Sequence, residues 1–113
     1  MPQKRNPLGL NPLQLKTLTL LQALALLPDA KPGDEDGSVL LTSLPDPHGD
    51  HFHLGDAVVA AKDATGLRNS AVWAALERKG LVTTQFPQSA TLLAAGLDYD
   101  TGLKDAILHR SSH

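Results

Sequence analysis

The sequence predicts a single α+β domain in which helices predominate, and three features of its composition support this prediction. At 113 residues, the chain is long enough for one compact domain and too short for two of ordinary size. Apolar residues make up 42% of it and charged residues 19%, as in a folded globular chain. Aromatic residues contribute only 4%, so leucine, alanine and valine must form the core, which favours packed helices over an all-β fold.

A first helix is predicted from Pro12 to about Leu27. Asn11 is a good N-cap, Pro12 suits the first helical position, and Gln14 is placed to complete a capping box. Pro28 ends the helix, because proline cannot continue the backbone hydrogen bonding. Its leucines cover more than half of the circumference, so we expect this helix to be central or shared with a second copy.

The N-terminal boundary of the domain is set just before this helix. Residues 1–10 carry two basic residues and two prolines, and we expect them to form a flexible arm. The single domain then extends over residues 11–113. No run of apolar residues resembles a signal peptide or a membrane span.

The middle of the chain is its acidic part, since residues 32–63 contain seven of the twelve acidic residues. Turn-forming and charged residues between 29 and 37 predict a mobile loop. Residues 38–44 and 51–54 have the short, β-tolerant composition of strands, and residues 45–50 are rich in turn formers. We therefore expect one hairpin whose tip carries acidic residues and histidines.

Two further helices are predicted beyond this hairpin. The second runs from Gly55 to about Ala64, and a turn at residues 66–68 separates it from the third. The third helix runs from about Asn69 to Lys79, with Asn69 or Ser70 as its cap and Gly80 just after its end. Residues 81–86 and 90–93 then predict two strands joined by a turn, and residues 95–110 a helical tail.

The residues around the turn resemble those of a known family. The segment Ala64-Thr65-Gly66-Leu67, followed by Val72, Leu76 and Gly80-Leu81-Val82, is similar to the helix-turn-helix and the start of the wing in bacterial winged helix transcription regulators. These include the multiple-antibiotic-resistance and arsenical-resistance repressor types. Leu92–Leu97 looks like the step from the wing to the following helix.

The resemblance implies a winged helix fold. This fold has a three-helix core with a helix-turn-helix, a small antiparallel sheet that forms the wing, and a C-terminal helical segment. Gly66 would take the backbone conformation of the tight turn, and Leu67 would fill the gap between the two helices. The first helix and the C-terminal segment would be the surfaces available to form a homodimer.

The resemblance also implies a small transcriptional regulator whose third helix enters the major groove of double-stranded DNA. Asn69 could pair with adenine, and Arg68 with guanine or phosphate. The residues expected to contact DNA are Arg68, Asn69, Ser70, Trp73, Arg78 and Lys79. A purely structural interpretation remains open, in which Asn69 and Ser70 cap the helix while Arg78 and Lys79 complement its dipole.

A second interpretation is a winged helix module for protein–protein interaction or oligomerisation that does not bind DNA. The formal net charge is −2, and the expected wing, residues 83–89, contains no lysine or arginine to contact phosphates. The stretch from Val72 to Leu76 is apolar and contains Trp73, which we expect to be partly buried against the wing.

Metal and enzyme chemistry receive little support from the sequence. The metal-ligand candidates are His48, His51 and His53, of which the last two would point to the same side of a strand. Their spacing matches no established zinc motif, so we expect no metal and no cofactor. The sequence contains no phosphate loop, nucleophile elbow or hydrolase motif, so we expect that the protein is not an enzyme. The chain has no cysteine, which fits a cytoplasmic location.

Overall fold

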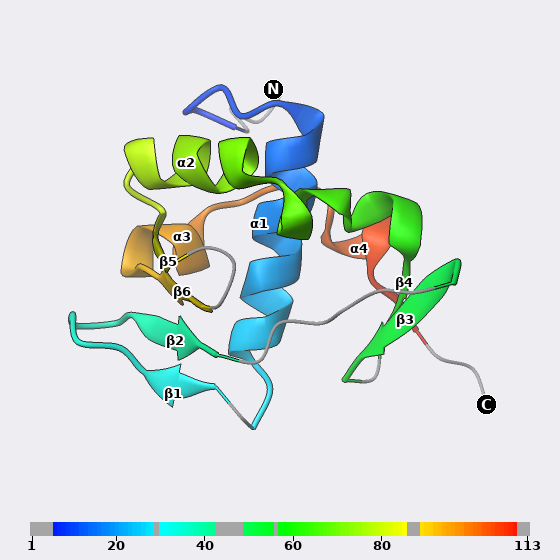
Figure 1. Cartoon of the computed structure of the whole chain (residues 1–113), viewed down its shortest axis with the longest axis horizontal. Coiled ribbons are helices and arrows are strands. Elements are labelled where there is room, and N and C mark those ends of the chain that lie inside the picture. Colours follow the sequence, from blue (N-terminus) through cyan, green and yellow to red (C-terminus); the bar gives the residue numbers. More distant parts are fainter. Residues whose placement is uncertain (1–5, 29, 43–48, 56, 86–88, 111–113) are drawn as a thin grey trace, which may run out of the picture.

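Helix α1 (Pro12–Ala25) runs through the centre of the molecule, and the other elements pack around it (Figure 1). A computed structural model describes residues 6–28, 30–42, 49–55, 57–85 and 89–110. These residues form an α+β fold with two small antiparallel sheets. The α+β class predicted from composition is therefore confirmed.

The start of α1 follows the local sequence signals closely. The Asn11 side chain accepts a hydrogen bond from the Gln14 amide at 2.8 Å, and the Gln14 side chain accepts one from the Asn11 amide at 2.9 Å. This reciprocal pair is the predicted capping box. The helix ends at Ala25, two residues before the predicted Leu27. Its buried residues lie all round the helix, as expected for a central position: Thr17, Leu18, Thr19, Leu20, Leu21 and Leu24.

The first sheet joins strands that are far apart in the sequence. Its strands are β1 (Lys31–Pro32), β2 (Val39–Leu41), β5 (Val82–Gln85) and β6 (Ser89–Leu92), in the order β1-β2-β6-β5 and all antiparallel. The predicted β5–β6 hairpin is confirmed. The mobile loop expected over residues 29–37 instead contributes β1 to the sheet, because Lys31 and Pro32 pair with Leu40 and Val39.

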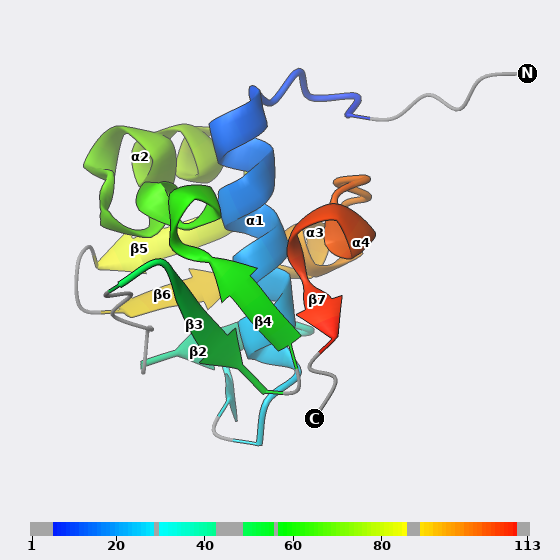
Figure 2. The same cartoon turned by 90° about the vertical axis from the view of Figure 1, so that its right-hand side faces the viewer.

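The second sheet contains β3 (His51–Leu54), β4 (Ala57–Ala60) and β7 (His109–Arg110), in the order β3-β4-β7 (Figure 2). The helix predicted over residues 55–64 is wrong, because residues 57–60 form β4. Val58 and Val59 are β-branched and suit a strand. Gly55 has a φ of 62°, a conformation that lets the chain reverse after Leu54.

The hairpin predicted between residues 38–44 and 51–54 is wrong as well. The strand β2 pairs with β1 and β6, and β3 pairs with β4. The reversal at Gly55 brings β4 beside β3 with the register Leu54 to Ala57. Because β4 is so close to β3 in sequence, the entropic cost of closing the loop between them is small. Residues 43–48, which include most of the expected hairpin tip, lie outside the described residues.

Two 3-10 helices replace the helix expected before the turn. These are η1 (Ala61–Asp63) and η2 (Thr65–Arg68). Gly66 lies inside η2 without the left-handed φ expected for a tight turn. Its role is close packing, since a Cβ atom there would overlap the Thr17 hydroxyl of α1. The helix-turn-helix geometry proposed for this segment is therefore not formed by two α-helices.

Helix α2 (Ser70–Arg78) confirms the third predicted helix to within one residue at each end. Asn69 is its N-cap, and its side chain accepts a hydrogen bond from the Ala71 amide at 3.0 Å. Gly80 follows the helix with a φ of 77°, as expected for a glycine just after a helix end. The buried side is Val72, Trp73, Ala75 and Leu76.

The tail forms two short helices, α3 (Ala94–Asp98) and α4 (Lys104–Ile107), rather than one helical segment over residues 95–110. Gly96 is buried in α3, where a Cβ atom would overlap the Leu81 carbonyl and the Leu92 side chain. This close approach seats α3 against the end of the β5–β6 hairpin.

The described part of the expected flexible arm is attached to the body of the molecule. Asn6 accepts hydrogen bonds from the Leu10 amide and from the Tyr99 hydroxyl, both at 2.7 Å. The Leu8 amide donates to the same hydroxyl at 3.0 Å, and Leu10 is buried. Residues 6–10 therefore belong to the folded unit, whereas residues 1–5 lie outside the described residues.

Candidate nucleic-acid interface

Helix α2 crosses the N-terminal half of α1 and presents one long side at the top of the molecule (Figure 1). Its buried side chains pack into the core cluster with α1. The 3-10 helix η2 directly precedes it and contacts both helices. The outer side of α2 is therefore the surface on which the predicted DNA contacts must be sought.

Three predicted residues meet at the N-terminal end of α2. Arg68 is the last residue of η2 and is exposed, and Ser70 is the first residue of α2 and is also exposed. Asn69 lies between them and is half-buried. The side-chain Oδ1 atom of Asn69 caps the helix by accepting a hydrogen bond from the Ala71 amide. The side-chain NH₂ is then the group that could donate to a base or phosphate.

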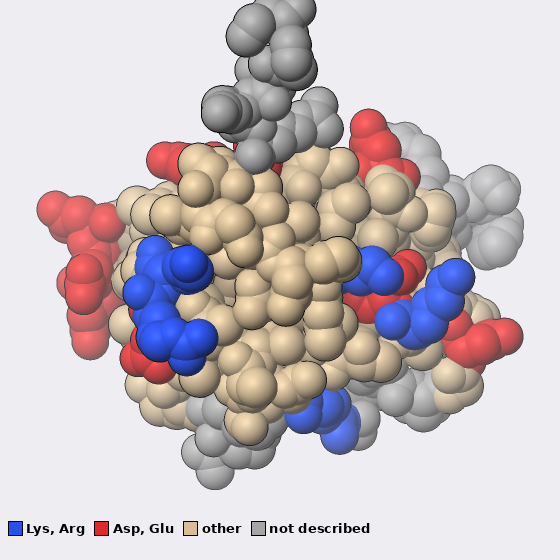
Figure 3. Space-filling model, turned by 90° about the horizontal axis from the view of Figure 1, so that it is seen from above, with Lys and Arg blue, Asp and Glu red and all other residues tan. Residues whose placement is uncertain are grey.

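Arg78 and Lys79 lie at the opposite end of α2, where both are exposed. Helix α2 itself has nine residues, which corresponds to about 14 Å along its axis. The exposed residues between the two ends are Ala71, Ala74 and Glu77. Figure 3 views this face from above: the lysines and arginines form separate groups, and a broad uncharged surface lies between them.

Trp73 does not belong to this surface. It is 1% exposed, and its indole NH donates to the Gly66 carbonyl at 3.2 Å. Both the predicted DNA contact and the predicted partial burial are therefore wrong for Trp73. The sequence contained a signal for full burial, because residues 72, 73 and 76 fall on one side of a helix. Trp73 fixes α2 to η2.

The β5–β6 hairpin, the expected wing, lies next to α2 and carries no basic residue between residues 82 and 92. Gln85 is exposed near its tip and accepts a hydrogen bond from the Ser89 hydroxyl at 2.7 Å. Residues 86–88 lie outside the described residues. The hairpin can offer amide and hydroxyl groups to a polar partner, but no positive charge.

The predicted histidine group is only partly brought together. His51 and His53 are exposed on β3, and their rings meet edge to face with centroids 5.7 Å apart. A hydrogen bond between His51 and Asp50, 3.0 Å long, lowers the pKa of the Asp50 carboxyl below its usual value. His48 lies outside the described residues. In the part of the chain that the structure describes, no three acidic or histidine side chains are placed to hold one metal ion.

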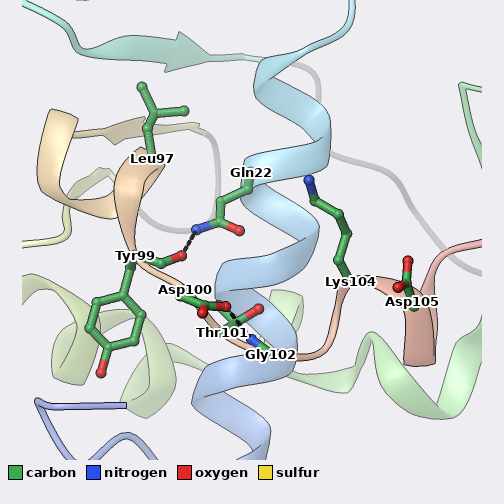
Figure 4. Close-up of a pocket in the computed structure, with 8 residues that line it drawn as sticks. All are labelled: Gln22, Leu97, Tyr99, Asp100, Thr101, Gly102, Lys104 and Asp105. Carbon is green, nitrogen blue, oxygen red and sulfur yellow. Dashed lines mark hydrogen bonds between the residues drawn. The ribbon is translucent and has the colours of Figure 1, made fainter. Parts of the chain in front are cut away.

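A pocket of about 380 Å³ lies between α1 and the α3–α4 segment (Figure 4). Gln22 reaches from α1 and donates to the carbonyls of Gly96 and Tyr99, both at 2.8 Å. Lys104 and Asp105 line the opposite side. The pocket could not be predicted from the sequence, because its lining residues come from α1 and from the α3–α4 segment, which are far apart along the chain. Gln22 serves to hold the α3 end on α1.

An ion pair behind the N-terminal end of α2 was also missed from the sequence. The Lys16 ammonium of α1 lies 2.9 Å from the Asp63 carboxylate of η1. Asp63 is buried, whereas Lys16 remains partly exposed. Because η1 and η2 lead directly into α2, this pair helps to set where Arg68 is presented. Only the fold brings the two residues together, 47 positions apart in the sequence.

Comparisons with known proteins found no match to this chain among family models, curated proteins or solved structures. Among the described residues, no helix is long and apolar enough to cross a membrane.

Proposed function

We propose that the chain is a winged helix domain that binds double-stranded DNA, with α2 as the helix that enters the major groove. The order of elements supports this assignment. Helix α1, strand β2, helix α2 and the β5–β6 hairpin occur in this order along the chain, with β1 before β2. The β3–β4 hairpin and two 3-10 helices occupy the place of the usual second helix.

The single observation that carries the proposal is the shape and charge of the outer side of α2. Arg68 and Ser70 are exposed at one end and Arg78 and Lys79 at the other, where Glu77 is exposed beside them, while Ala71 and Ala74 keep the middle narrow. A helix is about 10 Å wide and the major groove about 12 Å. Small residues at the centre would let α2 approach the bases while its two basic ends reach the flanking phosphates.

The proposal is tested by fluorescence anisotropy of a labelled random duplex, titrated with the full chain at low and at physiological salt. Phosphate contacts release counterions, so affinity must fall steeply with salt. Arg68→Ala and Lys79→Ala should each weaken low-salt binding and reduce the salt slope by about 1. Lys31→Ala is the matched control, because Lys31 is exposed on β1 at the opposite end of the molecule. The absence of low-salt binding would refute the proposal.

A second candidate function is protein–protein interaction or homodimer formation through the same side of α2. The observation that favours it is the uncharged surface around Ala71 and Ala74, together with a hairpin that lacks basic residues. Lys79→Ala distinguishes the two functions. Loss of this positive charge should weaken DNA binding, whereas self-association through the uncharged surface around Ala71 and Ala74 should persist, as measured by sedimentation velocity.

We further propose a cytoplasmic location and a role without catalysis or cofactor. A chain without cysteine is compatible with a reducing compartment. DNA binding by α2 requires neither a cofactor nor a reacting group, so the proposal is complete without them.

A further inference from the structure

The exposed side of the β3–β4–β7 sheet carries histidines that the proposed DNA interface does not use. Alternate residues of a strand point to the same side, which places His51 with His53 on one side of β3. The other side carries Phe52, which is half-buried, and Leu54, which is buried. The side of β3 that carries Phe52 and Leu54 packs toward the core. Both imidazoles therefore face solvent, where an ion can reach them.

The two imidazole rings have the separation that one bound ion requires. Their centroids lie 5.7 Å apart and their planes are inclined by 72°. An imidazole nitrogen binds Zn²⁺ at about 2.0–2.1 Å, which places the ring centre about 3 Å from the ion. Two rings that share an ion therefore have centres about 5–6 Å apart. The distance between the ring centres of His51 and His53 lies in this range.

Asp50 lies beside one of the two ring nitrogens of His51. The His51 Nδ1 atom lies 3.0 Å from the Asp50 carboxylate. An ionised carboxylate is acceptor-only, so a neutral His51 that donates its Nδ1–H to Asp50 has its lone pair on Nε2. A carboxylate behind a ligating histidine orients the ring and raises its basicity as a ligand. Asp50 thus acts as a positioning residue for His51.

We propose that His51 and His53 bind one divalent transition-metal ion of the Zn²⁺, Ni²⁺ or Cu²⁺ type. Imidazole nitrogen suits these ions, whereas Mg²⁺ and Ca²⁺ prefer oxygen ligands. Two protein ligands leave the remaining coordination positions to water, which agrees with the lack of a third ligand among the described residues. The site is therefore open, and its affinity should follow the order Cu²⁺ above Zn²⁺.

His109 provides a matched control on the same side of the sheet. It pairs with Val58, which in turn pairs with His53, so His109 lies two strands away from the proposed site. Neighbouring strands are about 4.8 Å apart, which puts His109 about 10 Å from His53 along the sheet. His109 is exposed like His51 and His53, but it is too distant to share their ion.

The test is isothermal titration calorimetry of the full chain with ZnCl₂ at pH 7.5, in a buffer that does not bind metal. We expect one ion per chain, and His51→Gln and His53→Gln should each weaken its binding on the order of tenfold or more. His109→Gln should bind as the unmodified chain does. Asp50→Ala should weaken binding several-fold, less than the two ligand variants, because Asp50 only orients His51.

Amide NMR spectra of each variant check the fold, which should persist because both side chains are exposed. The same spectra, recorded with substoichiometric Cu²⁺, should lose signals around β3 first, because the paramagnetic ion broadens nearby nuclei. Unchanged Zn²⁺ binding in the His51→Gln, His53→Gln double variant would overturn the proposal. Equal loss in His109→Gln would also overturn it, since it would show unspecific binding to surface histidines. DNA binding in the anisotropy experiment is independent of both outcomes.

Discussion

At the scale of single residues, the molecule depends on a few close contacts that tie the segment before α2 to the core. Gly66 lies against Thr17 of α1 with no space for a side chain, and Trp73 donates a hydrogen bond to the Gly66 carbonyl. These contacts hold η2 between two helices. Adding or removing even one methyl group at such positions should therefore change the free energy of unfolding, because the interior is close-packed.

The Gly66→Ala variant should lower the free energy of unfolding by about 1–3 kcal/mol, the usual cost of overpacking a core. The added methyl group would meet the Thr17 hydroxyl, which is itself held by a hydrogen bond to the Leu13 carbonyl at 2.8 Å. Urea denaturation measures the change. In the Thr17→Ala, Gly66→Ala double variant the penalty should be smaller than the sum of the single penalties. Strict additivity would show that the two residues do not interact.

Thr84→Val should raise the free energy of unfolding by about 1 kcal/mol. The Thr84 hydroxyl on β5 is buried without a hydrogen-bond partner in the described part of the chain, and a buried unsatisfied polar group is unfavourable. Valine has the same shape without the hydroxyl. Thr83→Val is the control, because Thr83 points to the other side of the strand and should show almost no change by thermal denaturation. A destabilised Thr84→Val variant would show that the hydroxyl has a partner.

At the scale of elements, local sequence signals predicted α1, α2 and the β5–β6 hairpin, whereas strand β4 could not be predicted from them. The α1 start was predictable because Asn11, Pro12 and Gln14 act within a single turn. The β4 strand was not, because a short apolar run such as residues 57–61 fits a helix or a strand equally well. What decided between them is the pairing with β3 and with β7, which lies some fifty residues further along the chain.

The capping box makes a direct test of how strongly α1 depends on its first turn. Asn11→Ala should destabilise the protein by about 1 kcal/mol, because the Gln14 amide loses its acceptor. Chemical denaturation of Asn11→Ala, Gln14→Ala and the double variant measures the coupling of the two side chains. The double variant should cost less than the sum, since each single change already breaks the reciprocal arrangement. Asn11→Asp is the conservative control and should retain most of the stability.

At the scale of the whole molecule, Tyr99 joins the N-terminal segment of the described chain to the segment between α3 and α4. Its hydroxyl donates to Asn6 and accepts from the Leu8 amide, and Gln22 holds the Tyr99 carbonyl on α1. None of this could be predicted from the sequence, where residues 1–10 have the composition of a free arm. Of the residues predicted to contact DNA, those at positions 68, 70, 78 and 79 are exposed. The full burial of Trp73 was missed, although residues 72, 73 and 76 fall on one side of a helix, because a large aromatic side chain also suits an interface.

Tyr99→Phe should release the N-terminal segment. The loss of both hydrogen bonds should reduce stability by about 1 kcal/mol and speed amide hydrogen exchange at Leu8 and Leu10 by at least several-fold. Exchange measured by NMR on the full chain would show this. Asn6→Ala should have a similar effect, and the two changes should not add, because they break the same network. Unchanged exchange at Leu10 would show that its burial alone holds the segment.

The two shortest strands, β1 and β7, affect the tendency of this protein to self-associate by strand pairing. One edge of each sheet is formed by a strand of only two residues, β1 or β7, and β1 contains Pro32; the other edge strands are β5 and β3. Proline removes a backbone donor, and a two-residue edge offers little template for another chain. A truncation after Leu108 would uncover the edge of β4 along Ala57 and Val58. Such a fragment should aggregate through strand pairing, which β7 blocks in the intact chain.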